Sequence, residues 1–294
     1  MNFQLEKFLE LAKGGSRISQ EAWYLEIISN NNQVLHTEDY NFILPIKSSL
    51  SIQQVIIPPF VQRIDPIARS SKNTLIELPN EVFSHFPCGV ICFSNRIQNP
   101  QNLLLEQVRT NYYLKLNKSY EELSKNYGSS HKINLKLAYR HNIQISESKN
   151  ISQFVDFFHK YSHASIPLRF KKKEIIFNLI NECLQRKSGT IYNVENQNRD
   201  LLGSAFITFY NNRIVYLISC STSEGRKQSV MFAIIDELIK RNCNSEMILD
   251  FEGSMIPGIA YFMKGFGAEE ESYYMYEWNE HWVCRFKKWM NKLR

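Results

Sequence analysis

The segment from Ile214 to Ile218 constrains the fold most strongly, because all five of its residues are apolar. A strand that is apolar on both alternations is typical of one covered on both faces of its sheet. Two other strand-like segments, Gly189 to Val194 and Leu201 to Tyr210, precede it, and turn residues separate the three. The pattern predicts a sheet with a fully buried inner strand in the second half of the chain.

Helical patterns lie on both sides of these strands in the sequence. Apolar residues recur at i, i+3, i+4 and i+7 from Ile151 to Phe158, as on one face of an amphipathic helix. The predicted elements after residue 150 are helices at 151–158 and 175–184, strands at 189–194, 201–210 and 213–220, a helix at 231–238, a strand at 247–251, a helix from about 257 and a strand at 273–276. This α-α-β-β-β-α-β-α-β order is similar to that of Gcn5-related acetyltransferases.

The first half of the chain is less regular. It predicts a helix at 3–13, strands at 40–45, 54–57, 89–93 and 108–116, and a helix at about 119–141 that links the two halves. Pro58 and Pro59 must end a strand or lie at its edge, because proline cannot donate to a sheet. No internal repeat is visible by residue identity.

Composition excludes several classes of protein. The length of 294 residues suits two domains, and no apolar run approaches the roughly 18 residues of a membrane span. The net charge of +6 is concentrated in residues 281–294, which carry five basic residues and no acid, so the rest of the chain is nearly neutral and unlike a dedicated nucleic-acid binder. The start of the chain lacks the apolar stretch of a secretion signal. Six scattered cysteines without a Cys-x-x-Cys pair predict reduced thiols in a cytoplasmic protein and no metal site.

Three groups of short segments carry a family resemblance. They are Leu44–Lys47 with Ile57–Arg63, Tyr120–Leu123 with His131–Ala138, and Asp250–Ser254 with Gly258–Ala260 and Phe266–Ala268. Their order and spacing resemble the Fem-type N-acyl and aminoacyl transferases, bacterial enzymes that build peptidoglycan cross-bridges.

The resemblance implies an α+β chain of two tandem GNAT-like domains with mixed sheets flanked by helices. The expected bounds are 1–145 for the first domain, including the linking helix at about 119–141, and 146–280 for the second. Residues 281–294 would form a helix that returns to the first domain, and their basic, amphipathic character also allows a weak contact with a membrane surface.

The resemblance also implies a reaction: transfer of an acyl or aminoacyl group from an activated donor to an amine such as that of a cell-wall precursor. Aminoacyl-tRNA is the favoured donor, and no tightly bound cofactor is expected. Two alternatives remain open, an acyl-CoA-dependent N-acetyltransferase and a protein that kept the fold but only binds its ligand. The sequence does not name the acceptor or the oligomeric state.

Asp250 and Glu252 are the first candidate catalytic residues. They lie at i and i+2 at the end of a predicted strand, where both carboxylates can face one space and deprotonate or orient the amine. Alternatively, they stabilise the following turn. Tyr261 is a third candidate, because many acetyltransferases place a leaving-group acid four residues before a glycine; counting from Gly265 selects Tyr261, whereas counting from Gly267 selects a methionine.

Basic residues are the candidates for binding phosphate. Arg226 and Lys227 lie in the loop 221–229, where coenzyme A users carry several glycines and this chain has only one. That shortage argues against acetyl-CoA. Three residues of the linking helix form a basic stripe that, with one residue near Pro59, can meet a phosphate or a tRNA backbone, or can simply be solvated. These residues are Lys132, Lys136, Arg140 and Arg63.

Overall fold

The computed structural model describes residues 17–29, 31–49, 52–69, 76–98, 105–162, 170, 172–253 and 255–279. The helices expected at 3–13 and 281–294 lie outside these residues, so they stay predictions. The chain divides into two compact units, one of Met1–Arg109 with Ser272–Arg294 and one of Thr110–Glu271. Among the described residues, each unit has a mixed sheet accompanied by helices, so the fold is α+β as expected, while the tandem arrangement of two domains is not confirmed.

The first unit is built mainly from short strands. Its elements are η1 (Ile18–Gln20), α2 (Ala22–Ile28), β1 (Asn32–His36), β2 (Tyr40–Ser49), β3 (Ile52–Val55), β4 (Ile67–Ala68), α3 (Asn80–His85) and β5 (Cys88–Phe93), with parts of β6 (Leu105–Lys115) and β12 (Glu269–Asn279). The strand order is β1-β2-β3-β5-β12, and β4 pairs with β2. The ring of Trp278 is buried beneath α3, where its Nε1 donates to the Phe86 carbonyl at 2.6 Å. Strand β3 ends before Pro58 and Pro59, as the sequence predicts.

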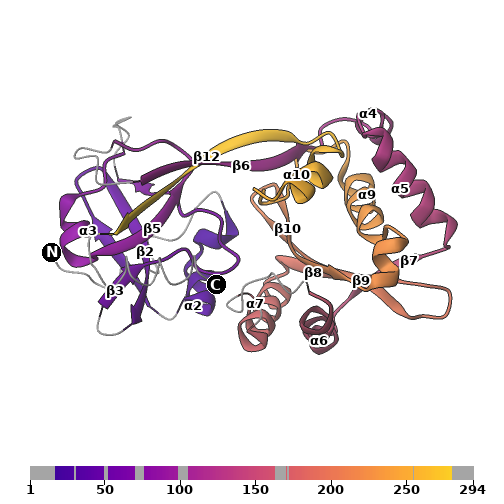
Figure 1. Ribbon diagram of the computed structural model, residues 1–294, viewed down its shortest axis with the longest axis horizontal. Helices are drawn as coiled ribbons and strands as arrows, with labels where there is room; N and C mark the ends of the chain where they lie inside the picture. Colours follow the sequence, from indigo (N-terminus) through magenta and orange to yellow (C-terminus); the bar gives the residue numbers. More distant parts are fainter. Residues whose placement is uncertain are drawn as a thin grey trace. The chain divides into compact units, whose positions relative to one another are not determined.

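The second unit contains the elements that the sequence defines best. They are α4 (Tyr120–Lys125), α5 (Ser129–Arg140), β7 (Gln144–Ser148), α6 (Ile151–Tyr161), α7 (Lys173–Gln185), β8 (Gly189–Glu195), β9 (Leu201–Tyr210), β10 (Arg213–Ser221), α8 (Ser223–Lys227), α9 (Val230–Asn242), β11 (Ile248–Asp250) and α10 (Pro257–Lys264), with the remainder of β6 and β12. Its strands follow the order β6-β11-β10-β9-β8-β7. In Figure 1, α6 and α7 lie on one side of β8, β9 and β10, and α9 lies on the other.

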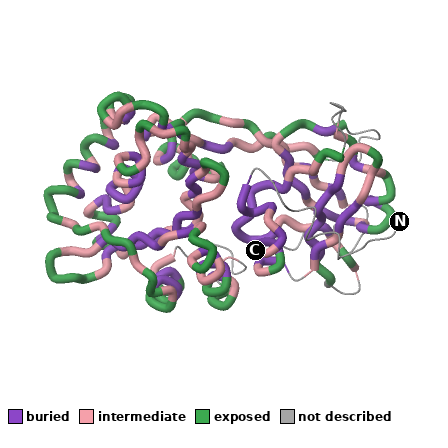
Figure 2. Tube along the Cα trace, turned by 180° about the vertical axis from the view of Figure 1, so that it is seen from behind, coloured by how far each residue is buried: buried purple, intermediate pink, exposed green. Residues whose placement is uncertain are grey.

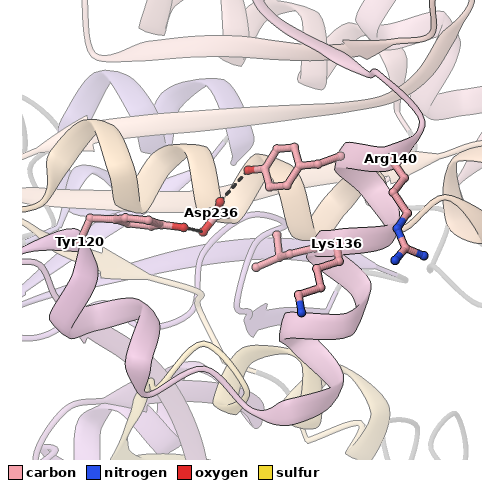
Figure 3. A pocket seen from close by; sticks show the side chains of 6 residues that line it. Tyr120, Lys136, Arg140 and Asp236 are labelled. Carbon is pink, nitrogen blue, oxygen red and sulfur yellow. Dashed lines mark hydrogen bonds between the residues drawn. The ribbon is translucent and has the colours of Figure 1, made fainter.

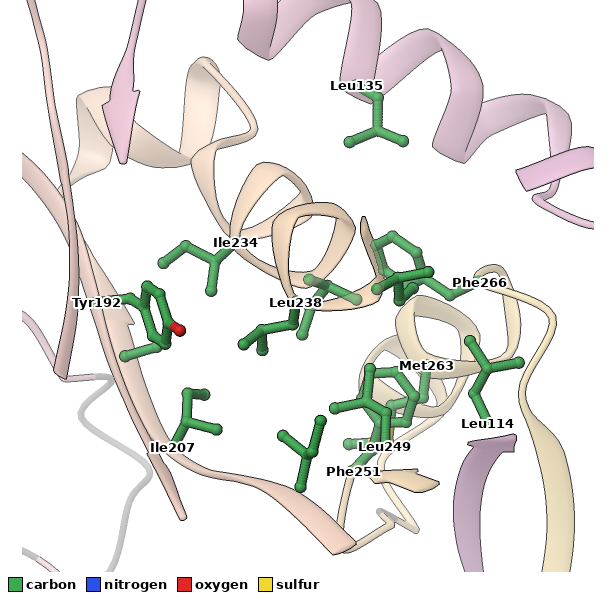
Figure 4. Packing of buried hydrophobic residues seen from close by; sticks show 14 of the residues in the cluster. Leu114, Leu135, Tyr192, Ile207, Ile234, Leu238, Leu249, Phe251, Met263 and Phe266 are labelled. Atoms are coloured by element: carbon green, nitrogen blue, oxygen red, sulfur yellow. The ribbon is translucent and has the colours of Figure 1, made fainter. Parts of the chain in front are cut away.

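This two-sided covering explains the apolar inner strands. Ile207 and Ile214 are fully buried, and Ile234 and Leu238 of α9 pack into the same cluster (Figure 4). Buried positions follow the strands, and the outer turns of the helices are exposed (Figure 2). Each apolar side chain of this size contributes roughly 1.5–3 kcal/mol when it leaves water, so the sheet between its two helix layers holds the second unit together.

The structure differs from the expected organisation in three places. The linking helix is two helices, α4 and α5, which break at Gly128. The second unit begins at Thr110 and not at residue 146, because β6 pairs with β11 and α5 packs on α9. Cys88 is disulfide-bonded, so the expectation of reduced thiols is wrong at this residue, whereas Cys92, Cys183, Cys220 and Cys243 are free.

Candidate functional site

Strands β10 and β11 of the second unit form a parallel pair that opens at one end. They pair only from Arg213–Ile248 to Val215–Asp250, where β11 ends while β10 continues to Ser221. A register shift between Tyr216 and Ile218 marks an irregularity in β10 at the same level. Among the described residues, no strand pairs with the β11-facing edge of β10 beyond Val215. Backbone N–H and C=O groups along that edge are therefore placed to hydrogen-bond a ligand.

Asp250 is held firmly at the point where the strands part. Its side chain is fully buried, its Oδ2 accepts from Arg213 Nη1 at 2.5 Å, and its Oδ1 accepts from the Glu252 backbone N–H at 2.8 Å. A buried carboxylate needs such partners, because desolvating an unpaired charge is costly. The turn-stabilising role that the sequence left open for Asp250 is thus present in the structure.

Glu252 does not continue the strand. It has a φ of 53°, and Gly253, at φ 56°, follows it in the same left-handed region. A Cβ at Gly253 would overlap the backbone of Thr110 on β6, so only glycine fits there. The alternation that would place both carboxylates on one face ends at Asp250, and the tight turn instead sets the position of Glu252. Ser254 lies outside the described residues.

The segment expected to be a phosphate loop is largely helical. Thr222 caps α8 by accepting from the Gly225 backbone N–H at 2.9 Å, and a Cβ at Gly225 would overlap the Leu202 carbonyl. Arg226 donates to the Ser221 carbonyl at 2.8 Å and to the hydroxyl of the residue after Thr222, so its guanidinium is engaged locally. The neighbouring lysine, Lys227, is exposed. The single glycine of this segment, Gly225, therefore allows α8 to pack closely against β9.

Tyr261 lies on the exposed side of α10. Its side chain is 63% exposed, and its hydroxyl shares a hydrogen bond of 2.8 Å with Ser130 Oγ at the start of α5. The alternative position, Met263, is buried in the core. Closer to the strand opening, Tyr216 of β10 is half-buried, burial raises its pKa, and its hydroxyl donates to Met231 Sδ at 3.3 Å. No sequence pattern marks Tyr216 as a functional residue, because it lies within an apolar run.

The predicted basic residues do not form one group. On α5, Lys132 donates to the Lys125 carbonyl at 2.9 Å, whereas Lys136 and Arg140 line a pocket. Arg63 belongs to the first unit, is buried and lies over the ring of Tyr273 at 5.6 Å. The basic stripe is therefore divided between a backbone contact and a pocket.

That pocket, of about 430 Å³, is a second polar site in this unit, and sequence reasoning missed its centre. It is lined by Tyr120, Leu135, Lys136, Tyr139, Arg140 and Asp236 (Figure 3). Asp236 is a fully buried carboxylate within the apolar stretch of α9. An acidic residue between Ile235 and Leu238 of an amphipathic helix is the signal that would have drawn attention to it.

Four donors surround the Asp236 carboxylate. Its Oδ1 accepts from Tyr120 at 2.8 Å and Tyr127 at 3.1 Å, and its Oδ2 accepts from Tyr139 at 2.6 Å and Lys240 at 2.6 Å. Burial, together with the carboxylate that accepts from them, raises the pKa of each of the three tyrosines. The tyrosines therefore remain neutral donors at neutral pH.

The described residues offer neither a membrane span nor a metal site. No helix among them is long and apolar enough to cross a bilayer. No three His, Cys, Asp or Glu side chains among them lie close enough to hold a metal ion.

Comparison with known proteins places the fold. No protein-family model matches the chain, and no curated protein matches it by sequence. Among solved structures, FemX superposes with a TM-score of 0.62 at 11% identity over 94% of this chain and 96% of its own. A conserved protein of unknown function from Bacteroides thetaiotaomicron VPI-5482 gives 0.60 at 9% identity over 93% and 96%. A C-terminal domain from Agrobacterium fabrum, assigned to a lysylphosphatidylglycerol synthetase, gives 0.55 at 8% identity over 98% and 95%. The resemblance to Fem-like proteins that the sequence predicted is confirmed at the level of the fold, which this chain shares with FemX over nearly its whole length.

Proposed function

We propose that the chain is an N-acyltransferase of the Fem-like type that transfers an aminoacyl group from aminoacyl-tRNA to the amine of a cell-wall precursor. The observation that carries this proposal is the opening between β10 and β11 beyond Val215, in a chain with the fold of FemX. Among the described residues, no strand pairs with this edge of β10 beyond Val215, beside the carboxylates of the β11 turn, and such an edge suits an acyl group held in an extended conformation.

The reaction is aminolysis of an ester. The amine nitrogen attacks the ester carbonyl, a C–N bond forms, and the ester C–O bond breaks to release the 3′-hydroxyl of the tRNA, while the amine gives up a proton. Glu252 is the proposed proton acceptor, and the proton that it takes from the amine passes on to the leaving 3′-oxygen. Asp250 is a positioning residue, because it holds the backbone of Glu252 and is itself held by Arg213. N–H groups on the free edge of β10 would stabilise the developing oxyanion. Tyr261, whose hydroxyl shares a hydrogen bond with Ser130, is not assigned a role in this scheme.

The structure of α8 is the reason why we favour aminoacyl-tRNA over an acyl-coenzyme A as the donor. A coenzyme A pyrophosphate is normally held by backbone N–H groups of a glycine-containing turn. Here the only glycine of the segment, Gly225, is buried against β9 and its N–H bonds Thr222. This arrangement supports a donor that does not need such a turn, and aminoacyl-tRNA is such a donor.

A transfer assay tests the proposal. The chain would be incubated with a mixture of radiolabelled aminoacyl-tRNAs and a UDP-linked peptide precursor that carries a free amine. We expect label in the precursor, and a rate lower by about 10²–10⁴ for Glu252→Gln, the range that proton-transfer groups contribute. Glu246→Gln is the matched control, because Glu246 is an exposed carboxylate just before β11 and should leave the rate unchanged.

The two other functions predict different outcomes. We expect calorimetric titration to show no acetyl-CoA binding tighter than about 1 mM, or roughly −4 kcal/mol. Micromolar binding, with acetyl transfer to amines, would replace this proposal by an acyl-CoA-dependent activity. Precursor binding without transfer from either donor would leave a binding protein, in which Glu252→Gln changes no rate.

A further inference from the structure

The pocket between α5 and α9 has a rigid, charge-balanced floor. A carboxylate has about four lone-pair sites, and three tyrosine hydroxyls and Lys240 occupy those of Asp236. Lys240 balances the charge of Asp236 and also donates to the Tyr139 hydroxyl at 2.9 Å. A metal ion or a basic ligand would therefore find no free acceptor on Asp236.

The remaining polar capacity of the pocket is cationic. Lys136 and Arg140 are exposed and stand one turn apart on α5, where side chains at i and i+4 are neighbours. Neither makes an ion pair or a hydrogen bond with any of the described residues, and in Figure 3 no interaction is drawn to either. Two uncompensated cations beside a neutral floor create a local preference for a dianion.

The other lining groups fit the organic part of a ligand. Leu135 is buried, and the ring of Tyr139, which is 41% exposed, gives an aromatic surface next to it. Tyr120 contributes a second ring from α4. A volume of about 430 Å³ lies within the range of small-molecule sites.

We propose that this pocket binds a small phosphate monoester of about nucleotide size, whose phosphate contacts Lys136 and Arg140 and whose body packs on Leu135 and Tyr139. The inference goes beyond the proposed acyl transfer and does not depend on it. It requires only the second unit, and the carboxylates of the β11 turn take no part.

A nucleic-acid backbone fits this site less well. A polyanion is typically bound by a row of cations that follows successive phosphates. The third basic residue of the stripe, Lys132, contacts the Lys125 carbonyl and does not line the pocket. Only two cations are left, and both border the same hollow, so they suit one phosphate better than a chain of them.

Calorimetric titration of the full chain with adenosine 5′-monophosphate, inorganic phosphate and adenosine tests the proposal. We expect the monophosphate to bind with a Kd below about 1 mM, phosphate more weakly and adenosine not measurably. Lys136→Ala and Arg140→Ala should each weaken binding about tenfold or more, since each removes a charge-assisted contact. Both residues are exposed, so unchanged circular dichroism is expected.

Lys132→Ala is the matched control, because it removes the same charge from the same helix outside the pocket. Undiminished binding in this variant supports the proposal. Equal weakening by all three variants would show a diffuse charge effect and overturn it. The absence of binding by the monophosphate would also overturn it, as would tight, steeply salt-dependent binding of an RNA hexamer that requires Lys132.

Discussion

Gly265, which caps the C-terminus of α10, is a position where a single added carbon should strongly lower the free energy of unfolding. Its φ of −67° suits any residue, so backbone strain is not the issue. A Cβ there would lie closer than 3.0 Å to three atoms of the His131 ring. We predict that Gly265→Ala strongly destabilises the second unit, because the ring has nowhere to move.

The magnitude follows from what surrounds His131. Its ring is buried and packs edge-on against Phe232 and Phe266, with centroids at 5.0 and 4.8 Å. Its Nε2 is hydrogen-bonded to the Phe262 carbonyl at 2.8 Å, and burial lowers its pKa. Relief of the overlap needs a shift of roughly 1.5 Å to restore ordinary contact distances. Overpacking costs about 1–3 kcal/mol and a lost buried hydrogen bond about as much again, so we expect a loss of about 2–6 kcal/mol.

Urea denaturation followed by circular dichroism and by tyrosine fluorescence would measure the free energy of unfolding, because all four tryptophans of the chain lie outside the second unit. Gly258→Ala is the control, because nothing lies within 4 Å of a Cβ at this position of the same helix; it should be neutral, or stabilising by up to about 1 kcal/mol. His131→Ala creates space, so the double variant with Gly265→Ala should lose less than the two single variants together. The reasoning is refuted if Gly265→Ala is as stable as Gly258→Ala.

Three further predictions concern charge and protonation. Arg213→Met should cost about 3–5 kcal/mol in urea denaturation, because it removes the cation that pairs with the buried Asp250 carboxylate; stability equal to the wild type would show that another group neutralises it. Burial raises the pKa of Tyr276 from 10.0 to about 12, so its contribution to stability is complete below pH 10 and lost as the pH rises towards 12, at up to about 1.4 kcal/mol per pH unit. Tyr276→Phe should make that alkaline decline shallower, and an unchanged decline would contradict this. Burial also raises the pKa of Cys183 to about 12, so peptide mapping after brief alkylation at pH 8 should find it unmodified while the half-buried Cys243 reacts; equal labelling would mean that Cys183 is accessible.

Sequence patterns are most accurate for the helices and strands in which buried positions follow a regular pattern. Strand β9 has the expected bounds, Leu201–Tyr210, because a mainly apolar segment rich in aromatic and β-branched residues is bounded by turn residues on both sides. Strand β7 was missed, because Gln144–Ser148 is mostly polar and half-exposed beside β8. The sequence predicts a loop where helix α8 lies, because a glycine in a short polar segment indicates a turn. The N-cap at Thr222 was the signal for a helix, but its effect depends on how Gly225 packs against β9.

The candidate site was harder to predict than the fold for a physical reason. The roles of Glu252 and Asp236 depend on contacts between residues far apart in the sequence, which no local pattern records. The sequence located the turn that holds Glu252 correctly, but the left-handed backbone that ends the strand alternation depends on how closely Gly253 approaches β6. Asp236 needs donors from α4, α5 and its own helix before its charge can be buried. Once those donors are in place, the carboxylate no longer attracts a ligand and instead fixes the tyrosines that form the pocket. An acidic residue in an apolar stretch of helix can therefore mark a pocket even when the acid itself binds nothing.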